Sequence, residues 1–202
     1  MGEINQPQAY STLLCQKLSA LVADYDVVVV ADYGHGMISR EAADLLCQKA
    51  KFLAINTQVN AGNTGFNTIS KYRRADYICL SEKELRLEAR SREKDLREIV
   101  EEASNRLSCD RLMITRGERG SLLYRKDEGF SQIPAFTERV VDRVGAGDAV
   151  FAITALCAAQ DAPIEELGFI GNCVGAQAVG VVGNRTPVER VSLSRYIECL
   201  MK

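Results

Sequence analysis

The stretch VVDRVGAGDAVFA, residues 140–152, places a run of small residues between a β-type apolar pair and an apolar run with helical spacing. Gly145 and Gly147 allow positive φ and a close approach of another group to the backbone. A helix that begins beside them points unpaired N–H groups outward, and such an end attracts anions. The sequence therefore predicts an anion-binding turn, with Asp148 directly after it.

Asp148 has two interpretations on local grounds. As an acid in the first turn of a helix, it stabilises that helix by about 0.3–1 kcal/mol. As a catalytic group, it could take the proton from a hydroxyl that attacks a phosphoryl group held by the N–H groups of the turn. Two familiar nucleotide motifs do not apply. Val150 stands where a Rossmann fingerprint needs its last glycine, and the chain lacks the Gly-Lys-Ser/Thr of a Walker A loop.

Helix-type and strand-type patterns alternate along the rest of the chain. We expect strands over 26–34, 52–56, 76–80 and 111–115, and helices over 8–23, 39–50, 81–89, 93–107, 147–160 and 163–183. Residues 120–134 favour two antiparallel strands. Alternating βα units predict an α/β fold, with a mostly parallel sheet, helices on both faces and the hairpin as an antiparallel edge. The continuous apolar run at 26–34 predicts a strand buried on both faces.

Active sites in such sheets lie at the carboxyl ends of the strands. That rule selects residues 32–36, 56–67, 80–84 and 115–120. The polar stretch from 56 to 71 is longer than a tight connection needs, so it is either a functional loop or a locally disordered one.

Length and composition bound the class of protein. With 202 residues the chain is long enough for one well-buried core, so we expect a single domain over 1–202. A net charge of −2 does not suggest a broad nucleic-acid-binding face, and no apolar run approaches the about 20 residues that cross a bilayer. Residues 1–20 lack a signal-peptide pattern. We therefore expect a cytoplasmic protein with small-molecule partners and neither nucleic acid nor membrane as a partner.

The cysteines and the histidine argue against disulfides, a zinc site and a multi-histidine metal site. Seven cysteines are scattered without a CxxC pair among mostly apolar neighbours, which suits free buried thiols. His35 is the single histidine, which excludes a metal site built from several histidines. We interpret His35 as a loop residue.

The stretch 140–152 resembles the C-terminal signature D-T-x-G-A-G-D-x-F of the PfkB, or ribokinase-like, carbohydrate kinases. Four other segments resemble family elements in the family's order: DYGHG (32–36), LSEKE (80–84), TRGERG (115–120) and NCVGAQAVGVVG (172–183). Within the family, the chain most resembles the branch of the D-glycero-D-manno-heptose-7-phosphate kinases of ADP-heptose synthesis. The resemblance implies a three-layer α/β/α ribokinase-like fold and transfer of a phosphoryl group from ATP to a hydroxyl of a sugar or sugar phosphate.

The resemblance also implies roles for individual residues at the glycine turn and the metal. Asp148 would be the catalytic base that deprotonates the sugar hydroxyl. The N–H groups of Gly145, Ala146 and Gly147 would form the anion hole for the transferred phosphoryl group. Glu84 would help to hold Mg²⁺ through water.

Further roles concern the nucleotide and the loop. Thr115, Gly117 and Gly120 would lie along ATP, with Asn172 near the adenine. Asp142 would brace the loop, and the resemblance implies that a monovalent cation could bind in its neighbourhood.

Plainer interpretations stay open for several of these residues. Glu84 could be only a solvated helix carboxylate. Residues 115–120 could form a plain hairpin turn. Gly168, Gly171 and Gly175 recur at helical spacing, so close helix packing is their default explanation and approach to a nucleotide the second.

The chain departs from the family pattern at specific positions. Arg143 and Val144 replace the usual threonine-containing pair, and Ser81 stands where asparagine opens N-x-x-E. INTQ (55–58) occupies the place of an aspartate, proline and lysine, so Asn56 removes a charge near the expected substrate region. Arg143 could contact an ATP phosphate or pair with an acid.

The resemblance covers nearly all of this chain but only the C-terminal two thirds of a typical member. We therefore expect the N-terminal part of the fold to be absent, with Met1-Gly2 as the start of an excised domain or truncated product. An edge strand exposed in this way predicts self-association, so the chain is expected to be a homo-oligomer or a domain of a larger enzyme. Two other functions remain open, namely a non-catalytic nucleotide-binding or scaffold domain and an unrelated α/β ligand-binding domain.

Overall fold

The structure is a computed structural model that describes residues 8–59, 62, 66–137 and 140–202. Its contacts divide the chain into two compact units, Met1–Leu112 and Met113–Lys202. The strands follow one another in the sheet in the order β1-β2-β3-β4-β5-β6. The expectation of one domain over the whole chain stays a prediction.

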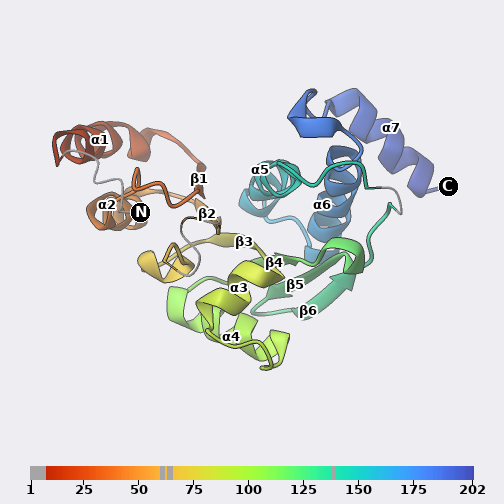
Figure 1. The fold of residues 1–202 in the computed structure, drawn as a ribbon, viewed down its shortest axis with the longest axis horizontal. Coiled ribbons are helices and arrows are strands. Elements are labelled where there is room, and N and C mark those ends of the chain that lie inside the picture. Colours follow the sequence, from red (N-terminus) through yellow and green to blue (C-terminus); the bar gives the residue numbers. More distant parts are fainter. Residues whose placement is uncertain (1–7, 60–61, 63–65, 138–139) are drawn as a thin grey trace. The chain divides into compact units, whose positions relative to one another are not determined.

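The first unit alternates helices with parallel strands. Its elements are α1 (Gln8–Leu21), η1 (Val22–Asp24), β1 (Val28–Asp32), α2 (Arg40–Lys49), β2 (Leu53–Thr57), η2 (Ile69–Lys71), β3 (Tyr77–Ser81), α3 (Glu82–Glu88) and α4 (Leu96–Leu107). β2 pairs in parallel with β1 and with β3, placing Val30 opposite Ile55 and Ile55 opposite Ile78. Helix α1 packs against α2, and α3 packs against α4 (Figure 1). The predicted βα alternation is confirmed here.

The second unit holds the hairpin and the two apolar helices. Its elements are η3 (Gly117–Arg119), β5 (Ser121–Arg125), β6 (Gly129–Ile133), α5 (Ala146–Ala159), α6 (Ile164–Ala178), η4 (Val182–Asn184) and α7 (Arg190–Leu200), while β4 (Arg111–Thr115) crosses the boundary. β5 and β6 pair antiparallel, with Leu123 opposite Ser131, which confirms the predicted hairpin. Helix α6 packs against α5, β5, β6 and α7 (Figure 1).

The core of the first unit lies around β2, whose five residues are all buried. β1 differs, because Val29 is 43% exposed while Val30 is buried. The prediction that this strand is buried on both faces is therefore wrong. β1 comes first in the sheet order, so it is an edge strand, and one of its faces stays uncovered by the described residues.

The second unit corrects two helix predictions. Helix α6 ends at Ala178 and not near residue 183, because the carbonyl of Val179 is taken by the N–H groups of Val141 and Asp142, at 2.8 and 3.1 Å. Helix α7 was not predicted. It begins after Glu189 without a side-chain cap, so the usual start signal is missing.

All seven cysteines lie in the described residues and are free thiols. Cys47, Cys79, Cys109 and Cys173 are buried, as predicted, whereas Cys199 is exposed. Burial raises the pKa of Cys79 and of Cys109 to about 12. None of the described helices is long and apolar enough to cross a bilayer.

Candidate functional site

A tight turn leads into α5 in the second unit. Gly145 stands at the N-cap in the left-handed region, with a φ of 73°, and α5 begins at Ala146. The Ala149 N–H donates to the Gly145 carbonyl at 3.0 Å, which is the first hydrogen bond of the helix. Asp148 lies half-buried in the first turn. The predicted glycine turn is therefore a helix start, one residue earlier than the sequence pattern indicated.

The backbone of this turn offers donors and space. The Ala146 N–H donates to the Arg143 carbonyl at 3.4 Å, so it faces the chain's own backbone. Apart from its chain neighbours and the backbone of its own helix, a Cβ atom added to Gly147 would meet no heavy atom of the described residues within 4 Å. The first N–H groups of an α-helix have no carbonyl partner within that helix. Open space and oriented donors beside Gly147 are the combination that suits an anion.

The Asp142 carboxylate ties the turn to the segment that follows α6. It accepts hydrogen bonds from the Val144 N–H at 3.0 Å and from the Gly183 N–H at 2.9 Å. These backbone hydrogen bonds, that of Val144 above all, hold the pKa of Asp142 below its ordinary value, because they stabilise the charged carboxylate. Asp142 thus fastens together two segments of the second unit.

The Arg143 side chain extends from the turn to the loop between β4 and β5. Its Nη2 lies 2.9 Å from Oε1 of Glu118. Both side chains face solvent, with exposed fractions of 69% and 79%. Of the two roles that the sequence left open for Arg143, the structure shows the pairing with an acid.

Residues 115–120 form a tight turn from β4 to β5. The Arg116 N–H donates to the Gly120 carbonyl at 2.8 Å. A Cβ atom at Gly120 would lie 2.0 Å from the Ile133 carbonyl oxygen, so this position excludes any side chain. Gly117 has a φ of +59° and open space around it. Backbone geometry alone accounts for both glycines, and ATP contacts of Thr115, Gly117 and Gly120 stay a prediction.

Helix α6 carries Asn172 and the spaced glycines. The Asn172 Nδ2 donates to the carbonyls of Ile133 and Pro134, at 3.0 and 2.8 Å, and so joins α6 to the end of β6. Its amide hydrogens are used by the backbone, so any contact with adenine falls to its oxygen. Cβ atoms at Gly168 and Gly171 would lie 2.5 and 2.6 Å from side-chain atoms of Leu123 and Met113, respectively, which confirms the packing interpretation.

In the first unit, Glu84 belongs to the N-terminal cap of α3. Its Oε2 accepts hydrogen bonds from the Ser81 N–H at 2.8 Å and the Ser81 hydroxyl at 2.7 Å. The Ser81 Oγ in turn accepts from the Glu84 N–H at 3.2 Å, which completes a capping box. The Val59 N–H donates to the other carboxylate oxygen at 3.3 Å. The Glu84 carboxylate thus caps the N-terminus of α3 through hydrogen bonds, and it is also a candidate for holding a metal ion.

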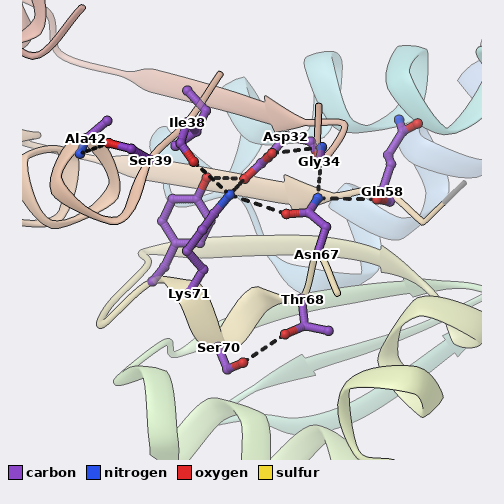
Figure 2. Close-up of polar contacts among 11 residues, drawn as sticks. Asp32, Gly34, Ile38, Ser39, Ala42, Gln58, Asn67, Thr68, Ser70 and Lys71 are labelled. Carbon is purple, nitrogen blue, oxygen red and sulfur yellow. Dashed lines mark hydrogen bonds and ion pairs between the residues drawn. The ribbon is translucent and has the colours of Figure 1, made fainter. Parts of the chain in front are cut away.

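A buried polar network lies at the carboxyl end of β1 (Figure 2). Asp32 pairs with the Lys71 ammonium and accepts a hydrogen bond from the Tyr72 hydroxyl at 2.8 Å. Lys71 Nζ also donates to Asn67 Oδ1 at 3.3 Å and to the Ile38 carbonyl at 3.1 Å. Burial, followed by the charge of Asp32, raises the pKa of the Tyr72 hydroxyl.

This network stabilises the long connection between β2 and β3. The Asn67 Nδ2 donates to the carbonyls of Asp32 and Gln58, at 2.8 and 3.3 Å. Asn67 lies in the stretch 56–67 that the rule on carboxyl ends of strands selected, whereas Lys71 and Tyr72 were not singled out from the sequence. The remaining signal was the length of the polar stretch 56–71. Part of that stretch, residues 60–61 and 63–65, lies outside the described residues.

Asn56 is buried at the end of β2 with one half of its amide unpaired. Its Nδ2 donates to the Cys79 carbonyl at 2.7 Å, whereas its Oδ1 is buried and has no hydrogen-bond partner among the described residues. Because a carbonyl can only accept, the amide nitrogen must face Cys79, which fixes the orientation of the amide. The position at which the family resemblance led us to expect an acid therefore holds a neutral acceptor.

Comparison with known proteins identifies the chain. The family model of the pfkB family carbohydrate kinases matches residues 5–190. The chain belongs to this family.

Curated relatives of this PfkB chain include the bifunctional protein HldE of Citrifermentans bemidjiense. It is 31% identical over 172 residues, which cover 84% of this chain and 35% of the relative. HldE of Campylobacter jejuni is 31% identical over 170 residues, which cover 81% of this chain and 35% of that relative. The chain thus spans about a third of the length of these relatives.

Solved structures of PfkB kinases share the fold. The potassium complex of phosphofructokinase-2 from Escherichia coli matches with a TM-score of 0.77 at 18% identity, over 93% of this chain and 62% of the other. Ribokinase from Arabidopsis thaliana, complexed with ribose and ATP, matches with a TM-score of 0.72 at 19% identity, over 90% and 59%. The expected ribokinase-like α/β fold is confirmed.

The solved ribokinase from Arabidopsis thaliana is complexed with ATP, and groups in this chain suit a phosphate and a metal ion. The space and donors beside Gly147 suit a phosphate. Glu84 already accepts three hydrogen bonds, so its carboxylate suits a water-mediated metal contact better than direct ligation. Each oxygen of Asp142 accepts one backbone N–H, which leaves lone pairs for a monovalent cation. Among the described residues, no group of three or more His, Cys, Asp or Glu could hold a metal by itself.

Proposed function

We propose that this PfkB chain transfers the terminal phosphoryl group of ATP to a hydroxyl of a sugar or sugar phosphate. The observation that carries the proposal is the start of α5, where Gly145 caps the helix, Gly147 leaves open space and Asp148 lies in the first turn. Such a site suits a reaction whose transition state carries charge on phosphoryl oxygens.

In the proposed reaction, Asp148 accepts the proton of the attacking sugar hydroxyl. The N–H groups of residues 145–147 hold the charge that develops on the phosphoryl oxygens, with Ala146 turning from the Arg143 carbonyl toward the ligand. Asp142 keeps the turn in place through Val144 and Gly183. Glu84 would help to hold Mg²⁺ through water, and the bound ion would supply neutralisation of charge on the phosphates.

The substrate proposed is a heptose phosphate. Support comes from the HldE relatives and from the resemblance to heptose-7-phosphate kinases. Thr115, Gly117, Gly120 and Asn172 are proposed to lie along the nucleotide, and a cytoplasmic location stays part of this proposal.

The test is a calorimetric titration of the chain with ADP and Mg²⁺, with Gly147→Val as the matched variant. Outside its own helix, none of the described residues lies within 4 Å of the added Cβ, so the variant should fold and lose affinity only because its side chain fills the phosphate space. We expect at least about ten-fold weaker binding, as for the loss of one or more charge-assisted hydrogen bonds. Equal affinity of the two proteins would remove the glycine turn from the site.

The alternative is a non-catalytic nucleotide-binding or scaffold domain, which the neutral Asn56 and the acid-paired Arg143 favour. Asp148→Asn separates the two. In a kinase it lowers kcat by about 100-fold or more while ADP affinity is kept. Turnover that survives this substitution contradicts the role of Asp148, and nucleotide binding without turnover in the unsubstituted protein supports the scaffold. Absence of any ATP or ADP binding points to an unrelated ligand-binding domain.

A further inference from the structure

The ion pair between Arg143 and Glu118 joins two loops of the second unit to which the proposed function assigns the nucleotide. Arg143 lies in the turn before α5, and Glu118 lies in η3 of the 115–120 turn. Their side-chain atoms are 2.9 Å apart. Arg143 also stands at a position where the family signature carries an uncharged residue, so the pair is a property of this chain.

The backbone around Arg143 is held by hydrogen bonds, whereas its side chain makes an exposed ion pair. The Arg143 carbonyl accepts a hydrogen bond from the Ala146 N–H at 3.4 Å. The carboxylate of Asp142, the preceding residue, accepts a hydrogen bond from the Val144 N–H at 3.0 Å. Two residues span at most about 7 Å, so the long side chain of Arg143 can reach the space beside the N-cap Gly145. The guanidinium is 69% exposed and can change partners without disturbing the core.

Glu118 is a weak partner for that guanidinium. At 79% exposure its carboxylate interacts through water of high dielectric constant, and exposed ion pairs of this kind contribute little. A phosphate offers more charge and accepts two parallel hydrogen bonds from a guanidinium. A polyphosphate at the glycine turn would therefore displace Glu118.

We propose that Arg143 binds the terminal phosphates of the nucleotide and that Glu118 holds its guanidinium beside the glycine turn until the nucleotide arrives. The inference rests on the proposed function. Arg143 is then a binding residue that contacts phosphate, and Glu118 is a competing partner that pairs with Arg143 in the absence of nucleotide. Exchange of the carboxylate for phosphate keeps the guanidinium paired both before and after binding.

The test compares ATP and adenosine as ligands of the unsubstituted chain, Arg143→Gln, Glu118→Gln and the double variant. Arg143→Gln should weaken ATP binding about ten-fold, as for the loss of a charged hydrogen bond, and leave adenosine binding within about two-fold. Glu118→Gln should tighten ATP binding about two- to five-fold, because it removes an exposed competitor. The double variant should match Arg143→Gln alone.

The outcomes separate this inference from the proposed function. Unchanged ATP affinity in Arg143→Gln, or weaker ATP affinity in Glu118→Gln, overturns the inference while nucleotide binding by the unsubstituted chain keeps the proposed function. An equal loss of affinity for ATP and for adenosine in Arg143→Gln also overturns the inference, because that result indicates a structural effect of the substitution. An unsubstituted, folded chain that binds neither ligand overturns both. All variants should keep the melting temperature of the unsubstituted chain, since both side chains are exposed.

Discussion

At the scale of single residues, Gly117 and Gly120 meet different demands within one turn. Both have positive φ, at 59° and 73°. Only at Gly120 would a Cβ atom collide with backbone, 2.0 Å from the Ile133 carbonyl oxygen. Gly117→Ala should therefore cost about 1–2 kcal/mol of unfolding free energy, and Gly120→Ala at least about 3 kcal/mol. Urea unfolding followed by circular dichroism measures both, and equal losses would contradict the predicted clash.

The Asp142 carboxylate should make stability depend on pH. Its pKa lies below the ordinary value because the folded state supplies the Val144 and Gly183 N–H groups to the charged form. A depressed folded-state pKa contributes stability above the unfolded-state pKa, and this contribution is lost as the pH falls through the folded value. Asp142→Asn should thus lower the melting temperature near pH 7, with a difference that shrinks below about pH 4. A difference that is constant with pH would contradict this role.

At the scale of secondary-structure elements, the start of α3 depends on Ser81. This short helix of seven residues is capped reciprocally by Ser81 and Glu84. Ser81→Ala should lower the free energy of unfolding by about 1 kcal/mol, whereas Ser81→Asn, which restores the family residue and keeps a capping oxygen, should be nearly neutral. Chemical denaturation of the two variants measures the difference. An asparagine variant as unstable as the alanine variant would show that the cap is not the source of the loss.

Element predictions succeeded where the signal was local. The helix predicted over 39–50 begins at its N-cap Ser39, whose Oγ accepts from the Ala42 N–H at 3.2 Å. The end of α6 was predicted wrongly because Val141, far away in the sequence, takes the carbonyl of Val179. Hydrogen bonds that span many residues leave no periodic pattern in the chain.

At the scale of the whole molecule, β1 predicts self-association through its edge. Val29 is 43% exposed on a strand at the edge of the sheet, and an edge strand presents unpaired backbone groups to another copy. We expect a mass that rises with concentration in size-exclusion chromatography with light scattering. Val29→Lys should abolish this rise of mass with concentration. The control Val182→Lys should not, because Val182 is 50% exposed but lies outside the sheet. A monomer at all concentrations would contradict the prediction.

The sequence by itself determined the alternation of helices and strands, the hairpin, and the glycine turn that begins α5, because each depends on residues a few positions apart. The tertiary structure alone decided which groups pair across long separations. Tyr72 reaches Asp32 over 40 positions, and Arg143 reaches Glu118 over 25. It also decided that one face of β1 is exposed, since burial depends on which elements cover a strand and not on the apolar run that forms it.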